Sequence, residues 1–445
     1  MEEITLQENT GQKIDFKSFE GKEVTLCGMV QNLRILSWGA FLILRTPYNT
    51  IQTIIENDST DLALNDILVE SAVVIKGTVK KAVIKDKAIF PRDYEINIKS
   101  INIISTPSEA ALPVDTTKKE MNVHLDKKFD YRPLTLRHPR ERAVFKIAAN
   151  ICRGFEEYLS SVGFTRICSP KLVCSGAEGG ANIFKLDYFG REAYLAQSPQ
   201  FYKQIMVGVF GRVFEIGPVF RAEKHATSRH LNEYISLDFE MGFIDSFLDL
   251  IKVEANALNA IFKRIETECA NEVDLLNIEV PRIDRIVTVK FHEVHDIIFK
   301  NYNKDYRNEK DLAPEEEKLL SEYAKSQWGT EFVFVTHYPS YKRPFYTMDD
   351  PDNPEVTFSF DLIFRNLEIT TGGQRLHKYE DYIKKMKRLN MNTQTFESYL
   401  QAFKYCMPPH GGLGLGLERL TSQLCGISNV KEASLFPRDI NRLEP

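Results

Sequence analysis

The sequence predicts an α+β protein with an N-terminal five-stranded β-barrel, followed by a larger domain in which an antiparallel sheet is flanked by helices. Three observations predict this. Short apolar–polar alternations fill the chain up to about residue 105, and a Pro, Ser, Thr and Lys mixture follows at 106–135. Beyond it, helical and strand patterns mix without the regular βαβ rhythm of a parallel sheet. We therefore expect a first domain at 1–105, a hinge at 106–135 and a second domain at 136–445.

The first domain shows five short alternating runs within a hundred residues, which is typical of a small barrel. An oligonucleotide-binding (OB) barrel is the leading candidate, and pattern alone supports a generic small β domain equally well. The expected strands are Glu23–Val30, Ala40–Arg45, Ile51–Ile55, Ala72–Val79 and Tyr94–Ile104.

Composition limits the classes of function. The 445 residues carry a net charge of -5, so a nucleic-acid site would have to be a local basic patch. The 7 cysteines are scattered without a C-x-x-C pair, which argues against a disulfide framework and a zinc site. The acidic start of the chain and the lack of a long apolar run predict a soluble cytoplasmic protein without a membrane partner.

In the second domain a helical period opens near Pro139 and closes at Gly163. Further on, the apolar strand Val213–Glu223 ends on an Arg and a Glu and continues through a polar loop into a second strand, Tyr234–Glu240. Arg221, held on a strand, is the residue type that grips a phosphate with two parallel hydrogen bonds. A structural surface hairpin explains this segment about equally well.

A glycine-rich segment, Gly411–Leu420, lies near the C-terminus. It fails the dinucleotide-binding fingerprint because Leu417 stands where the third glycine is needed. A glycine-rich strand leading into a helix would place Arg419 beside a polyphosphate, and close packing of the strand against a helix is the structural alternative.

The segment Phe358–His377 predicts a hairpin with Arg365 and Asn366 at its turn. A two-residue loop would place Asp361 opposite Thr370 and Ile363 opposite Glu368. Both carboxylates would then share one face of the sheet, and such a pair favours a bound cation.

A predicted helix start lies within Gln197–Gln204, with Ser198 as the N-cap and Pro199 at the first helical position. Gln200 and Lys203 then share a face one turn apart, where Lys203 can reach a substrate carboxylate. A capped surface helix is the alternative.

The two phosphate-gripping segments, in this order, resemble motifs 2 and 3 of the class II aminoacyl-tRNA synthetases, and Gly163–Pro170 resembles motif 1. The string Gln197–Gln204 is similar to the aspartyl-specific string of subclass b, in the short archaeal-type form. The class I strings His-Ile-Gly-His and Lys-Met-Ser-Lys-Ser are absent from the sequence.

This resemblance implies ATP-dependent activation of L-aspartate to aspartyl-adenylate, with Mg²⁺, and transfer to tRNA(Asp), with tRNA(Asn) as a further candidate substrate. It implies that the protein contacts tRNA at both the anticodon and the acceptor end. It also implies a homodimer formed through motif 1 around Pro170. The alternatives are an asparagine–tRNA ligase, which carries a different string at 197–204, an amidotransferase-like paralogue, which lacks the barrel, and a non-catalytic RNA-binding paralogue.

The resemblance also implies roles for individual residues. Aspartate binding is implied for Glu178, Gln197, Gln200, Lys203, Arg221 and Arg375. ATP binding is implied for Arg221, Glu223, Arg229, His230, Tyr234, Glu368, Gly416 and Arg419, of which Arg221, Glu368 and Arg419 act in catalysis. Metal binding is implied for Asp361, Glu368 and Thr371, and anticodon recognition for Gln31, Arg34, Phe41 and Gln52.

One geometric expectation follows from these roles. Strict alternation along the strand would place Arg375 on the opposite face from Glu368. We therefore expect a bulge or kink at Gly372 and Gly373 that returns Arg375 to the face of the carboxylates.

Overall fold

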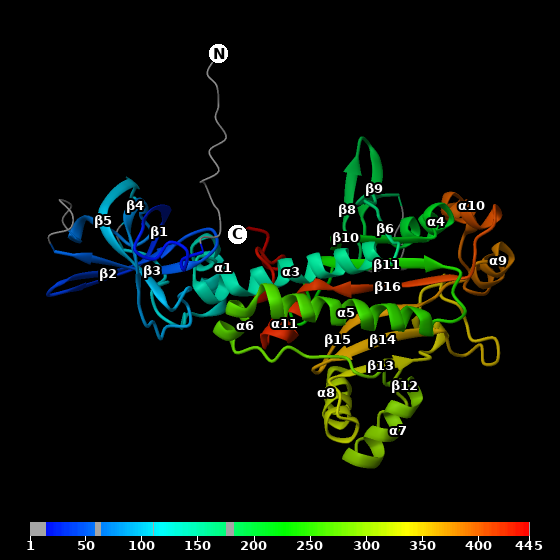
Figure 1. The fold of residues 1–445 in the computed structure, drawn as a ribbon. Coiled ribbons are helices and arrows are strands. Elements are labelled where there is room, and N and C mark those ends of the chain that lie inside the picture. The colour runs from blue at the N-terminus through cyan, green and yellow to red at the C-terminus, as the bar shows by residue number, and fades with distance from the viewer. Residues whose placement is uncertain (1–14, 58–63, 110, 175–181, 445) are drawn as a thin grey trace. The chain divides into compact units, whose positions relative to one another are not determined.

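The chain divides into two compact units, residues 1–143 with 274–276, and residues 144–273 with 277–445. The structure is a computed structural model and describes residues 15–57, 64–109, 111–174 and 182–444 (Figure 1). The predicted hinge at 106–135 contains two short helices, α1 (Leu125–Asp130) and α2 (Arg132–Thr135). The three-part division at 105 and 135 stays a prediction.

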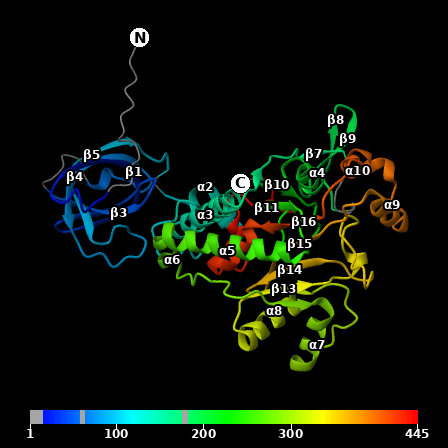
Figure 2. The same cartoon turned by 45° about the vertical axis from the view of Figure 1, so that its right-hand side comes forward.

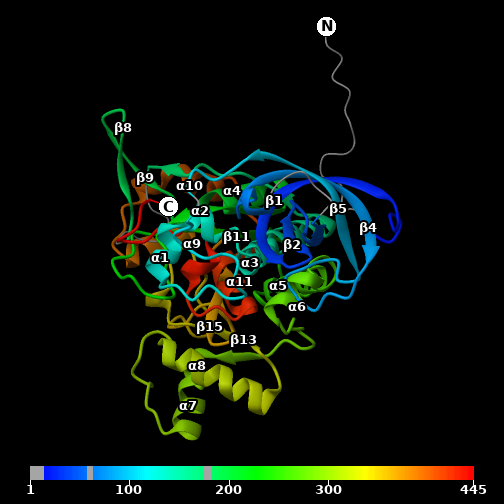
Figure 3. The same cartoon turned by 90° about the vertical axis from the view of Figure 1, so that its left-hand side faces the viewer.

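The first unit contains the predicted five-stranded barrel, closed in the order β1-β2-β3-β5-β4. Figure 3 labels four of its strands, β1, β2, β4 and β5. Only β3 and β5 pair in parallel, and the other neighbours are antiparallel. Alternate side chains fill the interior, among them Leu42, Leu44 and Ile75, so the barrel is a packed core. Its elements are β1 (Glu23–Leu36), β2 (Gly39–Arg45), β3 (Thr50–Glu56), η1 (Leu64–Asp66), β4 (Ala72–Lys81) and β5 (Tyr94–Ser105).

The second unit is built on an eight-stranded sheet in the order β12-β13-β14-β15-β16-β11-β10-β6 (Figure 2). Only the outer pairs β12–β13 and β10–β6 are parallel, so the sheet is predominantly antiparallel, as predicted. Its strands are β6 (Thr165–Arg166), β10 (Arg212–Phe220), β11 (Glu233–Gly242), β12 (Thr288–Lys290), β13 (Phe332–Thr336), β14 (Ser359–Phe364), β15 (Leu367–Gln374) and β16 (His410–Gly416). A small sheet contains β7 (Leu172–Val173), β8 (Lys185–Tyr188) and β9 (Arg191–Leu195).

Helices surround this sheet. The longest, α3 (Pro139–Ser161), begins and ends where the sequence predicts, and Gly154 lets it approach α5 (Leu248–Glu268) so closely that a Cβ at 154 would lie 2.9 Å from the Cα of Ile261. The other helices are α4 (Gln200–Phe210), α6 (Ala270–Leu276), α7 (Phe291–Tyr302), α8 (Pro314–Tyr323), α9 (Tyr379–Arg388), α10 (Glu397–Lys404) and α11 (Leu417–Cys425). A short π-helix spans Ala324–Trp328, and short 3-10 helices span Ser340–Lys342, Thr393–Phe396 and Val430–Ala433. Within the described ranges, no helix is both long and apolar enough to cross a membrane.

Alternation along β11 and β16 gives the sheet one apolar and one polar face. Leu237 and Phe239 pair with Leu415 and Leu413, and all four are buried on the apolar face. The residues between them, including Asp238 and Gly414, line a cavity on the opposite face. The Gly-Leu repeat of β16 therefore divides its leucines and glycines between core and cavity.

The predicted hairpin forms, but its register was predicted wrongly at one point. Arg365 and Asn366 make a two-residue turn with φ of 46° and 73°, and Ile363 pairs with Glu368 as expected. Asp361, however, pairs with Thr371, and not with Thr370, because Ile369 is an extra residue in β15.

The predicted bulge at Gly372 and Gly373 was wrong, because both glycines sit in a regular ladder. A bulge at Ile369, three residues before Gly372, reverses the side-chain direction of β15 instead. It brings Glu368 and Thr371 to the same cavity face. Gly372 serves close packing, since a Cβ there would lie 2.5 Å from Cζ of Phe360.

Helix α4 begins one residue later than predicted. Pro199 occupies the N-cap position, and the backbone N–H of Gln200 donates to Oγ of Ser198 at 3.3 Å. Gln200 and Lys203 still share one buried face of the helix.

Candidate active site

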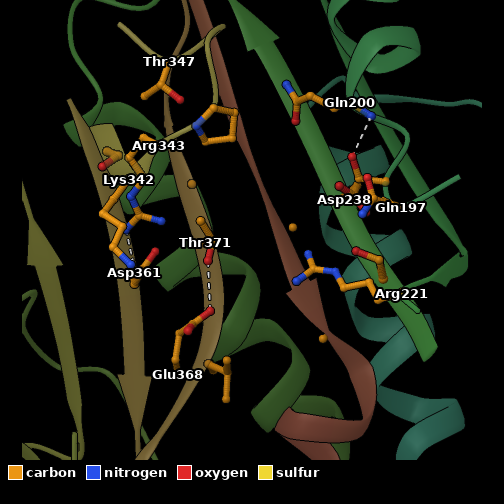
Figure 4. A pocket seen from close by; sticks show the side chains of 18 of the residues that line it. Gln197, Gln200, Arg221, Asp238, Lys342, Arg343, Thr347, Asp361, Glu368 and Thr371 are labelled. Carbon is orange, nitrogen blue, oxygen red and sulfur yellow. Dashed lines mark hydrogen bonds and ion pairs between the residues drawn. The ribbon is translucent and has the colours of Figure 1, made fainter. Parts of the chain in front are cut away.

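A cavity of about 680 Å³ opens on the polar face of the large sheet (Figure 4). Arg221, at the end of β10, and Arg419, in the first turn of α11, line this same cavity. The other lining residues that the sequence singled out are Gln197, Gln200, Lys203, Glu223, Arg229, His230, Tyr234, Asp361, Glu368, Thr371, Arg375 and Gly416. The structure thus brings these side chains together, while their individual roles stay predictions.

At one end of the cavity lies a buried set of two cations and two carboxylates, which we call the charge quartet: Lys203, Arg375, Asp238 and Glu240. Nζ of Lys203 lies 2.8 Å from Asp238 and 3.5 Å from Glu240. Nε of Arg375 donates to Glu240 at 2.9 Å. Although burial would raise it, Arg375 and Lys203 hold the pKa of Glu240 below its usual value. The two cations are therefore already paired within the protein.

The glycines of β16 make room for this quartet. Gly412 pairs with Glu240 and Gly414 pairs with Asp238 across the β11–β16 ladder. A Cβ at 412 would lie 2.2 Å from Oε2 of Glu240. The bare backbone also supplies acceptors, since Gly412 O accepts from Arg375 at 2.9 Å and Leu413 O accepts from Lys203 at 2.7 Å.

The opposite end of the cavity holds the predicted metal-binding carboxylates. Thr371 donates its hydroxyl to Glu368 at 2.9 Å, and Nη2 of Arg343 donates to Asp361 at 2.7 Å. Burial raises the pKa of Asp361 to about 6. Burial opposes ionisation of Glu368 as well, but Arg419 and Thr371 lower its pKa overall.

Cationic and aromatic groups also line the cavity. The guanidinium of Arg221 is 5.7 Å from the ring centroid of Tyr234, and Nη1 of Arg419 donates to the backbone oxygen of Glu368 at 2.8 Å. Burial, then Arg419, lowers the pKa of His230, which favours a neutral ring. Arg229 is ion-paired with Glu317, so a phosphate there would have to compete with this carboxylate.

The remaining predicted site residues lie outside this cavity. Glu178 falls at 175–181, outside the described residues. Phe41 and Gln52 are half-buried on the outer face of the barrel, and the exposed Arg34 pairs with Phe41 across the β1–β2 ladder. Gln31 is a bulged residue only 3% exposed that accepts from Arg45 at 2.6 Å and donates to Thr116 O at 3.0 Å, so its present contacts are internal.

Several groups that the structure places in or beside the site were not predicted from the sequence. Asp238 and Glu240 had a detectable signal, because acids alternate with Leu237 and Phe239 in β11. Arg343 had none, because it lies in a connection before β14 and reaches Asp361 only through tertiary folding. Glu317, at the N-terminal end of α8, accepts the backbone N–H of Glu368 at 2.8 Å.

Two known protein families match the sequence. Residues 124–440 match tRNA synthetases class II (D, K and N), and residues 24–104 match the OB-fold nucleic acid binding domain. The fold and the cavity together define a class II synthetase catalytic unit joined to an OB-fold barrel. The chain belongs to the class II tRNA synthetases of the D, K and N group.

Relatives resemble the chain over nearly its full length. The aspartate–tRNA(Asp/Asn) ligase of Deinococcus radiodurans is 44% identical, with 96% of each chain covered, and that of Thermus thermophilus is 43% identical, covering 97% of this chain and 99% of the relative. The asparaginyl-tRNA synthetase of Pyrococcus horikoshii, complexed with asparaginyl-adenylate, superposes with a TM-score of 0.85 at 28% identity, covering 96% of this chain and 97% of that chain. The aspartyl-tRNA synthetase of Entamoeba histolytica gives 0.84 at 29% identity, covering 98% and 94%.

One buried acid beneath the site yields a prediction about pH. Glu254, on α5, is 2% exposed, and neither carboxyl oxygen has a hydrogen-bond partner in the described part of the chain. Burial raises its pKa to about 8, so the folded state keeps a proton that the unfolded state loses above the ordinary value of 4.5. The contribution of Glu254 to stability is therefore present at low pH and lost as pH rises from 4.5 to 8.

We predict that the stability of Glu254→Gln relative to the unaltered chain will increase as pH rises from 4.5 to 8, because only the unaltered chain has to keep a proton on a buried carboxyl over this window. Urea unfolding at several pH values measures the difference. Glu355→Gln, at an exposed position, is the control and should produce no such trend. A pH-independent difference for Glu254→Gln would contradict the assignment.

Proposed function

We propose that this protein is an aspartate–tRNA ligase that forms aspartyl-adenylate from L-aspartate and ATP and transfers the aspartyl group to tRNA. The observation that carries the proposal is the shared cavity of Arg221 and Arg419, with the charge quartet at one end and the carboxylates Glu368 and Asp361 at the other. The names of the relatives from D. radiodurans and T. thermophilus support the same activity.

In the first step an α-carboxylate oxygen of aspartate attacks the α-phosphorus of ATP, and the bond to the β-phosphate breaks to release pyrophosphate. In the second step a terminal ribose hydroxyl of tRNA attacks the carbonyl carbon, and AMP leaves. Both nucleophiles belong to substrates, so the protein has to align them and stabilise developing negative charge. Arg221 would hold the α-phosphate, and Arg419 and His230 would hold the outer phosphates.

Amino-acid recognition would come from the quartet. Lys203 and Arg375 direct positive charge at the side-chain carboxylate of aspartate, while Asp238 and Glu240 hold both cations in place. An asparagine–tRNA ligase is the second candidate, supported by the structural similarity to the P. horikoshii enzyme. Comparing pyrophosphate exchange with each amino acid distinguishes the two activities.

The site also suits Mg²⁺. Glu368, Asp361 and Thr371 offer oxygen ligands, and the buried Oδ1 of Asp361 has no hydrogen-bond partner within the described residues. One or two carboxylates combined with substrate phosphates is the usual protein environment of Mg²⁺. When bound, the ion would neutralise charge on the phosphates.

We predict that Arg221→Ala will lower kcat/KM for aspartate-dependent pyrophosphate exchange about 10²- to 10³-fold, the usual effect of removing one preorganised donor to a transition state. Arg307→Ala is the matched control, because this arginine is half-exposed and ion-paired with Asp305 outside the cavity. Near-normal exchange by folded Arg221→Ala would contradict the assignment of Arg221.

We further propose that the barrel binds the anticodon of both tRNA(Asp) and tRNA(Asn). The outward position of Phe41, with the partly exposed Trp38 ring 5.3 Å away, provides a surface on which a splayed base can stack, and Gln52 lies on the neighbouring strand. The names of the relatives include both tRNAs.

Charging of purified tRNA(Asp) and tRNA(Asn) tests this. Loss of one stacked base corresponds to about 1–3 kcal/mol, so Phe41→Ala should lower kcat/KM for charging at least fivefold while pyrophosphate exchange stays unchanged. Val83→Ala, at a 91% exposed position in the connection between β4 and β5, is the control. Unaltered charging by Phe41→Ala, or charging of only one tRNA by the unaltered protein, would contradict the corresponding part of the proposal.

We also propose a homodimer through motif 1, supported by the exposed position of Pro170 beside the short strand β6 and by the half-exposed Leu172. Light scattering should give twice the 51.2 kDa mass of the chain, and Pro170→Arg should lower the measured mass. A monomeric mass for the unaltered protein at micromolar concentration would contradict it.

A further inference from the structure

A second buried polar network lies behind the charge quartet and is not explained by substrate contacts. It joins Gln204 of α4 to His410 of β16, Tyr382 of α9 and Tyr399 of α10, and each of these side chains is at most 3% exposed. Polar groups buried this deeply require specific hydrogen bonds. The donor and the acceptor of each of these hydrogen bonds can be assigned in turn.

The assignment begins at a backbone carbonyl, that of Pro408. The oxygen of Pro408 can only accept, so Nδ1 of His410, 2.9 Å away, must carry the proton. Burial lowers the pKa of His410 to about 4, so the ring is neutral and Nε2 must be an acceptor. Nε2 of Gln204, 2.9 Å from this atom, is accordingly the donor.

The same assignment of donors and acceptors extends to the charge quartet. With its nitrogen on His410, Gln204 presents Oε1 to Nε2 of Gln200 at 2.9 Å, and the hydroxyl of Tyr399 donates to the same oxygen at 3.0 Å. Gln200 in turn presents Oε1 to Nη2 of Arg375 at 3.4 Å. A backbone carbonyl thus determines which end of the Gln200 amide meets the guanidinium.

We propose that His410 and Gln204 are positioning residues that hold the oxygen of the Gln200 amide against Arg375 and thereby support recognition of a carboxylate-bearing amino acid. This inference rests on the proposed function. It adds residues that touch neither substrate nor phosphate and act only through Gln200 and Arg375.

The opposite orientation of the Gln200 side-chain amide is disfavoured because it loses hydrogen bonds. Rotation of Gln200 would place its NH₂ group against the N–H groups of Arg375 and its oxygen against Oε1 of Gln204. Two hydrogen bonds would be lost in a buried region, where each unsatisfied polar group is costly. Without the proton on Nδ1 of His410, the amide of Gln204 has no such constraint and both orientations of Gln200 become accessible.

The orientation of the Gln200 amide matters because the guanidinium of Arg375 has other partners besides Gln200. Its guanidinium also bonds Glu240 and the carbonyl of Gly412, so displacement by a facing NH₂ group would turn the planar fork away from the substrate. Recognition of a carboxylate depends on that fork. Binding of ATP, which we assign to Arg221 and Arg419, does not.

Two variants test the proposal by pyrophosphate exchange. His410→Phe keeps the ring that stacks on Phe403 but removes both nitrogens, and Gln204→Met keeps the length of the side chain without its polar atoms. Each should raise the KM for aspartate about three- to tenfold, the equivalent of one buried hydrogen bond, and lower the preference for aspartate over asparagine. The KM for ATP should stay within twofold.

Phe403→Leu is the structural control, since Phe403 packs on Tyr382, Tyr399 and His410 but has no polar atom. It should lower the thermal midpoint while changing neither KM more than twofold. The proposal is overturned if a folded His410→Phe or Gln204→Met keeps the normal KM for aspartate, or if Phe403→Leu raises it equally. Absence of aspartate-dependent exchange in the unaltered protein would instead refute the proposed function, and with it the role of this network.

Discussion

The buried charge quartet is the constraint on which the site depends. Removing one partner from a buried ion pair is strongly destabilising, because the remaining charge lies outside water without compensation. The four residues of the quartet come from three elements: Lys203 from α4, Asp238 and Glu240 from β11, and Arg375 from the C-terminal end of β15. These elements must meet correctly before any of the four charges has its partner. Formation of the cavity is thereby coupled to formation of the sheet.

This constraint explains features that look separate in the sequence. The alternating glycines of β16 remove side chains where Asp238 and Glu240 need space. The backbone oxygens of Gly412 and Leu413 accept from Arg375 and Lys203. The apolar residues between the glycines bury the other face of the sheet. One strand therefore serves the core and the site at the same time, and the rigid sheet holds its polar groups ready before substrates arrive.

Much of this could be predicted from sequence because it follows local rules. The barrel strands, the two-residue hairpin turn and the glycine-rich strand leading into α11 each depend on neighbours in the chain. The bulge was expected at Gly372 and Gly373 because Arg375 had to return to the face of the carboxylates, whereas the structure inserts Ile369 and uses Gly372 to admit the ring of Phe360. A crowded ring from another strand leaves no mark in local sequence.

The ion-pair partners of two predicted site residues were missed for a similar reason. Burial demands partners for charged groups, and Arg343 and Glu317 reach Asp361 and Arg229 from distant segments. Several charged groups of the site are therefore already ion-paired within the protein. Substrate recognition must come from the direction of its donors more than from unpaired positive charge.

The most direct measurement is a crystal structure of the protein with a non-hydrolysable aspartyl-adenylate analogue. We expect the phosphate mimic within hydrogen-bond distance of Arg221 and the side-chain carboxylate against Arg375 and Lys203. The contacts of both cations with Glu240 and Asp238 should be preserved. An analogue bound with its carboxylate away from the quartet, or a quartet broken apart on binding, would contradict it.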